Sequence, residues 1–474
     1  MAGTWKALAH QPPFRPDTML LLTDGTVMCQ EYAGIGWWKL TPDPTGDYVN
    51  GTWSRLAPMH DARLFYASAV LADGRVFVAG GEYSSAGGDT PNAEIYHPLH
   101  DGWLQIASPA GWTEVGDAPC CVLADGRVLL GSIQNRQTAI LDPVGLSWTA
   151  AALKDDSSSE ESWVLLAGGS VLTAECTNHP NAEKYLPDSD AWVGAGVLPV
   201  DLVEASSLEI GPGVLLPDGR ALFLGATPHT ALYTPPAPPA PSDPGSWAAG
   251  PDFPPGDKGE TLGAKDAPAC LLPNGRVLCA AGPVDGIAAD YLSPTYFFEH
   301  DGSAFAKAPP PGNVVGAPFQ GRMMLLPTGQ VLFSGGTPEI YVYDPDGQPD
   351  KAWAPTITVV PPVISPQGTY RLIGTQLNGR SQAVAYGDDV SSATNYPLVR
   401  LSFKASGKVR YCRTFNHTVK DKDGNEIASM GVATGATPVS TWFTVPADIE
   451  TGAADLVVVA NGIPSEPRAV TVQA

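Results

Sequence analysis

The chain has 474 residues, of which 43% are apolar, only 16% are charged, 51 are glycine and 47 are proline. This composition describes a turn-rich folded protein, long enough for more than one domain, and excludes a disordered chain. The net charge of −22 would repel a phosphate backbone, so nucleic acid is not an expected partner.

No stretch approaches the roughly 20 apolar residues that a helix needs to span a bilayer. The first residues, MAGTWKALAHQPPF, lack the basic and apolar regions of a signal peptide, so the sequence assigns no compartment. The cysteines are odd in number, lie mostly in apolar runs and show no zinc-binding spacing. We therefore expect buried free thiols at Cys29, Cys120, Cys121, Cys176, Cys270, Cys279 and Cys412.

One short unit recurs seven times: an apolar run, a tight turn and a second apolar run. The turns begin at Asp24, Asp73, Asp125, Gly168, Asp218, Asn274 and Thr328, separated by 43 to 56 residues. A third run with a Tyr or Leu before Asp or Pro follows, and a Trp-centred run closes most units. Four strands in about 50 residues, repeated seven times, predict an all-β, seven-bladed β-propeller.

The ends of this repeat predict how the ring closes. Residues 3–8, GTWKAL, resemble the closing run GTWSRLA at 51–57, so we expect them to supply the outer strand of the seventh blade. The Pro-rich stretch 235–246 is expected to be a surface loop of the fifth blade. After Trp353 the repeat stops, and five alternating runs follow. We therefore predict a propeller over 1–354 and an immunoglobulin-like β-sandwich over 355–474.

The inner strands of a propeller begin around its central tunnel, so residues seven to nine before each turn should meet at its mouth. Those positions are Asp17, Phe65 or Tyr66, Asp117, Glu160 or Glu161, Glu209, Asp266, and Phe319 or Gln320, with Arg63 and Arg322 nearby. Carboxylates crowded in a funnel repel unless a cation, an arginine or a proton relieves them. One interpretation is a site for Ca²⁺ or another divalent cation at Asp117, Glu161 and Asp266, or for a cationic substrate. The other is a set of solvated or salt-bridged acids.

The glycine pairs after the second run, the Tyr of the third and the Trp of the fourth are kelch-like. Together with the C-terminal region, the chain resembles the galactose oxidase and glyoxal oxidase family over nearly its whole length. The phrases that carry the resemblance are ARLFYASAVLADGRVFVAGG at 62–81, MMLLPTGQVLFSGG at 323–336 and DLVVVANGIPSEPRAVTV at 455–472. The resemblance implies secretion and a copper centre with a cysteine-crosslinked radical tyrosine, a tyrosine–histidine pair and a second histidine from the C-terminal domain.

The positions that match this copper centre hold other residues: Thr18, Phe65, Phe319-Gln320 and Asn395. Phenylalanine has no atom that ligates a metal. We therefore expect neither copper nor copper-radical oxidation. A copper oxidase with a relocated site is the remote alternative, because Tyr66 lies one residue from the crosslinked position and His417 is a histidine of the C-terminal region.

Two functions remain open after this comparison. The first is a monomeric binding protein for a carbohydrate, small molecule or protein, acting through the funnel face. The second is an enzyme with non-radical chemistry (a lyase, hydrolase or isomerase, with or without a divalent metal) that uses the acidic funnel for acid–base work. The candidate residues are Asp17, Arg63, Tyr66, Asp117, Glu161, Glu209, Asp266, Gln320, Arg322, Asn395 and His417.

Overall fold

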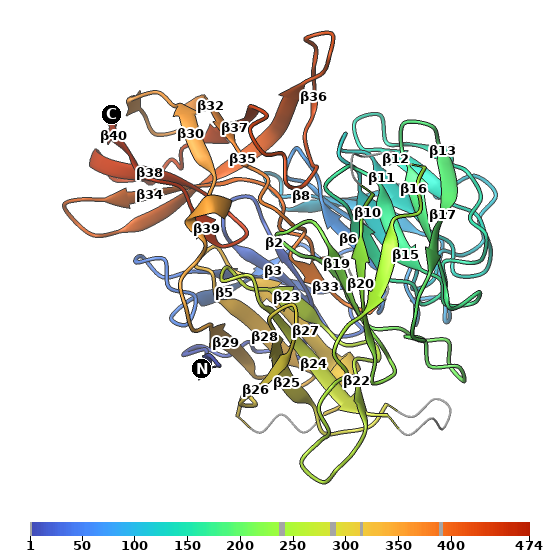
Figure 1. Cartoon of the computed structure of the whole chain (residues 1–474). Helices are drawn as coiled ribbons and strands as arrows, with labels where there is room; N and C mark the ends of the chain where they lie inside the picture. The colour runs from blue at the N-terminus through green and yellow to red at the C-terminus, as the bar shows by residue number, and fades with distance from the viewer. Residues whose placement is uncertain (1, 237–241, 285–290, 313–315, 388–391) are drawn as a thin grey trace.

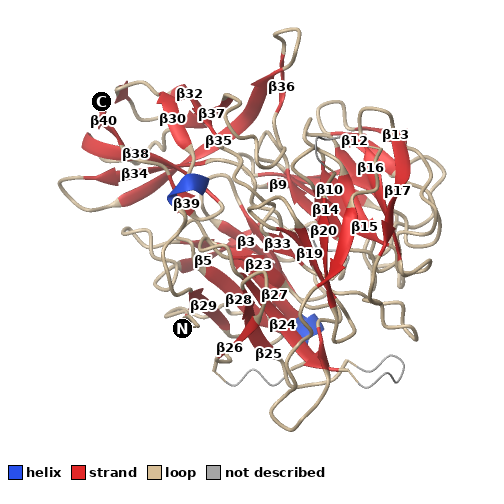
Figure 2. Ribbon diagram, viewed as in Figure 1, coloured by secondary structure: helices blue, strands red, loops and turns tan. Residues whose placement is uncertain are grey.

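The computed structural model describes residues 2–236, 242–284, 291–312, 316–387 and 392–474 (Figure 1). Among these residues the structure is almost entirely β, with two short 3₁₀ turns, η1 (Pro318–Gln320) and η2 (Lys351–Trp353) (Figure 2). Part of the predicted Pro-rich loop, 237–241, lies outside the described residues. The described part of the chain contains no helix with the length and apolar character needed to cross a bilayer.

Six four-stranded antiparallel sheets, and a seventh in which two short strands join the four of the blade, confirm the predicted seven-bladed propeller. The first four blades are β2 (Pro16–Leu21), β3 (Val27–Glu31), β4 (Trp37–Thr41) and β5 (Thr52–Leu56); β6 (Ala67–Val70), β7 (Val76–Ala79), β8 (Ala93–His97) and β9 (Gly102–Ile106); β10 (Cys120–Val122), β11 (Val128–Leu130), β12 (Ala139–Asp142) and β13 (Ser147–Ala150); and β14 (Trp163–Leu165), β15 (Val171–Ala174), β16 (Asn181–Leu186) and β17 (Ala191–Val197).

The last three blades complete the ring. They are β18 (Gly213–Leu215), β19 (Ala221–Leu224), β20 (Thr230–Thr234) and β21 (Ser246–Ala249); β23 (Ala269–Leu271), β24 (Val277–Pro283), β25 (Tyr296–His300) and β26 (Phe305–Ala308), with β22 (Leu262–Gly263) beside β24; and β27 (Gly321–Leu325), β28 (Val331–Gly335), β29 (Ile340–Asp344) and β1 (Thr4–Ala7). The N-terminal strand β1 pairs antiparallel with β29, from Thr4 opposite Asp344 to Ala7 opposite Tyr341. The two ends of the ring therefore share one sheet.

The recurring turn explains why each inner hairpin is so short. In the second blade the Gly74 amide donates to the Leu71 carbonyl at 2.8 Å, and Gly74 has a φ of +81°. This left-handed conformation is open to glycine at little cost. The Asp73 carboxylate accepts a hydrogen bond from the Arg75 amide at 3.0 Å, and this bond stabilises the turn.

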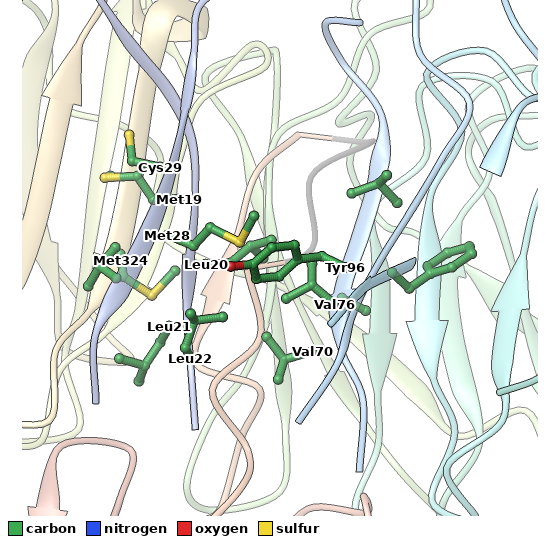
Figure 3. Close-up of a cluster of buried hydrophobic side chains, with 14 of the residues drawn as sticks. Met19, Leu20, Leu21, Leu22, Met28, Cys29, Val70, Val76, Tyr96 and Met324 are labelled. Atoms are coloured by element: carbon green, nitrogen blue, oxygen red, sulfur yellow. The ribbon is translucent and has the colours of Figure 1, made fainter. Parts of the chain in front are cut away.

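The core of the propeller consists of three apolar clusters, each of which spans neighbouring blades. Figure 3 shows Met324 of the last blade, Met19 and Leu20 of the first, and Val76 and Tyr96 of the second. All five are at most 1% exposed. Because burying one such side chain contributes roughly 1.5–3 kcal/mol, interblade packing is the main source of stability of the ring.

Outer-strand tryptophans join five of the seven blades to the blade before them through backbone carbonyls. Their indole N–H groups donate to backbone carbonyls: Trp5 to Pro309 (2.7 Å), Trp53 to His10 (3.1 Å), Trp103 to Ala57 (3.0 Å), Trp148 to Ala107 (2.6 Å) and Trp247 to Ala195 (3.0 Å). Each ring thus covers apolar surface while its polar edge is satisfied.

The C-terminal strands form one ten-stranded hydrogen-bonded sheet system with its own apolar core. Its members are β30 (Thr356–Val359), β31 (Val363–Ile364), β32 (Thr369–Thr375), β34 (Leu398–Phe403), β35 (Val409–Lys420), β36 (Glu426–Ala428), β37 (Val439–Thr444), β38 (Gly452–Ala460), β39 (Ile463–Pro464) and β40 (Arg468–Val472). The 12-residue strand β35 pairs with both β34 and β37 and so links the two halves. An immunoglobulin-like topology stays a prediction.

One C-terminal segment leaves this sheet and enters the propeller. Strand β33 (Val384–Ala385) pairs antiparallel with the inner strand β23, Ala385 opposite Ala269 and Val384 opposite Cys270. The C-terminal region is therefore part of the propeller as well as its neighbour, a feature that the repeat pattern did not predict.

We predict that Trp5→Ala weakens ring closure. Trp5 is half-buried and packs on Phe297, Phe333 and Tyr343 at centroid distances of 5.3, 5.5 and 4.7 Å. Loss of these contacts should lower the free energy of unfolding by about 2–4 kcal/mol, measured by denaturant titration. Lys6→Ala, an exposed position on the same strand, is the control and should change it by less than about 0.5 kcal/mol. Equal effects of both variants would contradict the proposed role of β1.

Candidate functional site

The inner strands place the two ends of the tunnel in different surroundings. Their Asp-Gly turns face the C-terminal strands: a Cβ added to Gly25 would lie 2.5 Å from Tyr411, and one on Gly74 would lie 3.3 Å from Arg413. Each inner strand begins at the opposite end of the tunnel from its turn. We call that end the funnel. Segment 381–387 runs from the turn end to the funnel, where the Tyr386 hydroxyl donates to the Phe319 carbonyl at 2.5 Å.

Four blades enter the funnel through a residue in the left-handed backbone region. Phe65, Glu160, Leu208 and Asp266 have φ values of +46°, +60°, +63° and +44°. For residues other than glycine such a conformation costs about 1–3 kcal/mol, and it persists where the surrounding structure fixes it. Strained positions of this kind concentrate at functional sites, and here they coincide with, or immediately precede, the predicted funnel residues.

Arg322 organises the wall of the funnel beside the first, second and last blades. Its Nη2 lies 3.0 Å from Asp17 Oδ1, and its Nη1 donates to the Phe319 carbonyl at 2.8 Å. Its guanidinium lies 4.2 Å from the ring centroid of Tyr386 and 5.6 Å from that of Phe65. Two of the predicted residues, Asp17 and Arg322, are thus brought together as a buried ion pair with the guanidinium held against aromatic rings.

Three carboxylates meet on the other side of the funnel, from the fourth, fifth and sixth blades. Glu160, Glu209 and Asp266 each offer an oxygen within 4.8 Å of the other two. The Tyr291 hydroxyl lies between two of them, 2.5 Å from Glu209 Oε1 and 2.8 Å from Asp266 Oδ2. We call these four residues the acidic group.

In the acidic group, the Tyr291 phenol offers one proton to the two carboxylates that it contacts. A phenol has one proton and can donate it to Glu209 or to Asp266, but not to both. The second contact is a hydrogen bond only if the other carboxyl is protonated and donates to the phenol oxygen. Burial, followed by the charges of Asp266 and Glu209, raises the pKa of Tyr291 far above its usual value, so the phenol stays protonated. This arrangement suits either a shared proton or a cation.

Aromatic rings surround the acidic group and the arginine wall. Phe319 packs on Tyr291 at a centroid distance of 4.6 Å, and Phe65 lies 6.5 Å from Tyr83, which is 63% exposed. The Tyr83 pKa is raised by the neighbouring Glu82 first, then by burial and by Asp117 among other charges. Asp117 is itself buried. The funnel is therefore both acidic and aromatic.

Glu161 does not join the acidic group, although the sequence pattern placed it there with Asp117 and Asp266. It belongs to a second set of acids, with Asp156 and Glu183. The buried Lys154 ammonium lies 2.9 Å from Glu161 and 3.3 Å from Asp156, and it also bonds to Glu183. In the fourth blade it is Glu160, one residue earlier, that reaches the funnel. Lys154 could not be anticipated because it lies outside the counted positions.

Three further predicted residues lie near the funnel in supporting roles. Arg63 is fully buried, with its Nη2 2.9 Å from Glu94 Oε1. Tyr66 is also fully buried, and its hydroxyl donates to Gln30 Oε1 at 2.7 Å. Gln320 lies in η1, half-buried at the start of the last inner strand. Arg63 and Tyr66 therefore hold the wall rather than face a ligand.

Asn395 and His417 lie away from the funnel. The Asn395 amide donates to the Met430 carbonyl at 2.6 Å. His417 is fully buried in β35, with Nδ1 2.9 Å from Thr441 Oγ1, and burial lowers its pKa to about 3. Its amide faces the Ala72 carbonyl at the turn end of the second blade. The structure thus places His417 at the wrong end of the tunnel for a funnel ligand.

Sequence counting missed Tyr291 and Tyr386, two residues on which the funnel geometry depends. Tyr291 lies after β24 of the sixth blade, and Tyr386 comes from the C-terminal segment inside the tunnel. Neither is at a fixed distance from an Asp-Gly turn. The only local signal was the aromatic residue itself, so tertiary structure was needed to find them.

Comparison with known proteins agrees with the architecture. No protein-family model matches the chain, and no curated protein matches it. Among solved structures, a fungal alcohol oxidase of the AA5 family in complex with copper aligns over 100% of both chains, with 14% identity and a TM-score of 0.57. A catalytically inactive virginiamycin B lyase from Staphylococcus aureus with quinupristin aligns over 72% of this chain and 99% of its own, with 9% identity and a TM-score of 0.50. At these identities the likeness establishes the fold alone.

We predict that Glu175→Gln changes the pH dependence of stability. Burial, followed by Asp156 and Glu183, raises the Glu175 pKa from 4.5 to about 7. The folded state therefore prefers the protonated carboxyl. The contribution of Glu175 to the free energy of unfolding is complete below about pH 4.5 and is lost as the pH rises to about 7. The substituted glutamine is uncharged at every pH. The melting temperature of the variant should therefore exceed that of the wild type at pH 8 and match it near pH 4.5.

Thermal unfolding across this pH range measures the difference between variant and wild type. Glu466→Gln, at an exposed position, is the control and should give a flat difference. A flat difference for Glu175→Gln as well would show that Glu175 is ionised in the folded protein.

Proposed function

We propose that this protein is a binding protein that holds a cationic ligand in the funnel and has no copper-radical oxidase activity. The observation that carries the proposal is the Tyr291 hydroxyl lying between Glu209 and Asp266, with Glu160 within reach of both. A hard divalent cation such as Ca²⁺ takes several carboxylate oxygens and would replace the shared proton.

The charge balance around the acidic group supports a cationic ligand. Lys265 lies 4.5 Å from the centroid of the Tyr291 ring, and its ammonium is 3.9 Å from Glu204. Burial and then the charges of Asp89 and Glu209 raise the pKa of Glu82, so negative potential extends to the funnel rim. A cation entering the funnel would relieve this repulsion.

The residues at the expected copper positions do not fit that metal. Phe65 and Phe319 offer only ring carbons, and their rings contact Tyr83 and Tyr291. Tyr66 is buried with its hydroxyl bonded to Gln30, away from any histidine ligand. The donor set that remains is carboxylate and phenol oxygen, which suits hard cations better than copper.

An enzyme with acid–base chemistry is the second candidate function. It is favoured by the extra proton of the acidic group, because a protonated carboxyl beside an ionised one can act as acid and base in turn. Turnover of a lyase, hydrolase or isomerase substrate that is lost in Tyr291→Phe, while the fold is retained, would support this candidate over simple binding.

We predict that divalent cations stabilise the protein through the acidic group. Titration of CaCl₂ or MnCl₂, followed by calorimetry and thermal unfolding, should show binding that the double variant Glu209→Gln/Asp266→Asn loses. Asp156→Asn is the matched control, because that second acidic set already contains Lys154. Cation binding that survives the double variant would refute the site, and stabilisation by an alkylammonium salt alone would identify an organic cation as the ligand.

We also predict no alcohol or aldehyde oxidation by copper-loaded protein. A peroxide-coupled screen over primary alcohols, sugars and aldehydes should stay at the level of a heat-denatured sample. Turnover that follows copper occupancy, and disappears in Tyr66→Phe, would establish a relocated oxidase site and overturn this part of the proposal.

A further inference from the structure

A cleft of about 1050 Å³ lies at the turn end of the propeller, on the opposite side of the ring from the funnel. One wall comes from the first two blades, around Pro44, Asp73 and His97. The other comes from β35 and the loop after β37, around Arg413, Phe415 and Pro446. Clefts of this size between two packed units are where small ligands commonly bind.

Two arginines of β35 reach the cleft without a carboxylate partner. Arg410 donates to the Val409 carbonyl at 3.2 Å, and Arg413 donates to the Asp73 carbonyl at 2.6 Å. Within the described ranges, neither forms an ion pair with a carboxylate. In a chain with 49 acidic and 27 basic residues, two arginines without an ion pair at one cleft are unexpected.

Two nitrogens in the cleft also lack an acceptor or donor. Arg413 Nε and His97 Nδ1 are buried and, among the described residues, have no hydrogen-bond partner. Buried polar atoms are normally satisfied, so each of these two nitrogens is an exception. An oxyanion would satisfy the Arg413 guanidinium in the geometry that guanidinium groups favour.

Two acids that line the cleft partly offset the burial of Arg413: burial lowers its pKa, and the charges of Asp73 and Asp24 raise it. The Asp73 carboxylate bonds to Arg75 Nε at 2.7 Å, and the carboxylates of Asp24 and Asp43 accept hydrogen bonds from their own turns. Asp448 is exposed at the rim.

His97 lies in the cleft near cationic side chains and near Asp73. Burial lowers the pKa of this histidine, and the charges of His100, Arg413 and Arg75 lower it further. His97 is thus neutral near pH 7, and it lies in the field of neighbouring cations that an anion would relieve.

Part of the cleft wall is apolar. The Arg413 guanidinium lies 4.9 Å from the ring centroid of Phe415, so ring and cation present one continuous surface. Pro44 and Pro446 also line the cleft, and Leu99 is 63% exposed beside them. Such a surface suits a ligand with an apolar body and a single charged end.

We propose that this cleft binds a small organic anion, with its oxyanion on Arg410 and Arg413 and its apolar body against Phe415 and the prolines. The proposal is independent of the funnel, because none of these residues belongs to the acidic group.

The test uses para-(trifluoromethyl)benzoate as the probe, followed by fluorine NMR. The benzoate should bind, and its neutral amide should bind at least about tenfold more weakly, since a charge-assisted hydrogen bond is lost. Phenyl phosphate should displace the benzoate if the site binds oxyanions in general. If it does not displace the benzoate, the site is specific for carboxylates. Arg410→Gln and Arg413→Gln should each weaken benzoate binding about tenfold.

Two control variants test whether benzoate binding depends on the cleft rather than on charges elsewhere in the protein. Arg220→Gln removes an arginine from the equivalent turn of the fifth blade, outside the cleft, and should leave binding unchanged. Glu209→Gln/Asp266→Asn should also leave it unchanged, so the funnel proposal can fail without affecting this one. Equal binding of benzoate and amide, or wild-type affinity in a folded Arg410→Gln variant, would overturn the proposal.

Discussion

The pairing of β1 with β29 is the constraint on which the rest of the molecule depends. It places residues from the two ends of the propeller in one sheet, so the seventh blade has its fourth strand. Closure fixes seven inner strands around one axis, and this convergence puts Asp17 of the first blade beside Arg322 of the last. Without it, neither the funnel nor the tunnel would exist as a defined space.

The buried acids of neighbouring blades have two different kinds of partner. Around Glu161, the Lys154 ammonium supplies a permanent positive charge, and the set is a structural ion cluster. Around Glu209 and Asp266, the phenol of Tyr291 lies within hydrogen-bond distance of both carboxylates. A phenol carries no positive charge, so it does not neutralise these carboxylates as the Lys154 ammonium does in the other set, and this difference separates a supporting cluster from a candidate site.

The two ends of the propeller also differ in charge. The funnel end gathers carboxylates among aromatic rings, whereas the turn end faces Arg410 and Arg413 across a cleft. The C-terminal region shapes both ends, because β35 forms one wall of the cleft and segment 381–387 carries Tyr386 through the tunnel to the funnel. In a protein with a net charge of −22, the cleft thus brings three arginines, Arg75, Arg410 and Arg413, to one surface.

The sequence by itself determined the seven blades, because each Asp-Gly turn with its flanking apolar runs is a local signal that repeats at a regular interval. Counting from these turns also identified Asp17, Glu209, Asp266 and Arg322, since the length of an inner strand is nearly constant. Tertiary structure decided the rest. A one-residue difference separates Glu160 in the funnel from Glu161 on Lys154, and alternate residues of a strand point to opposite faces. Tyr291, Tyr386 and the burial of His417 depend on contacts between segments far apart in the chain, and no local pattern encodes them.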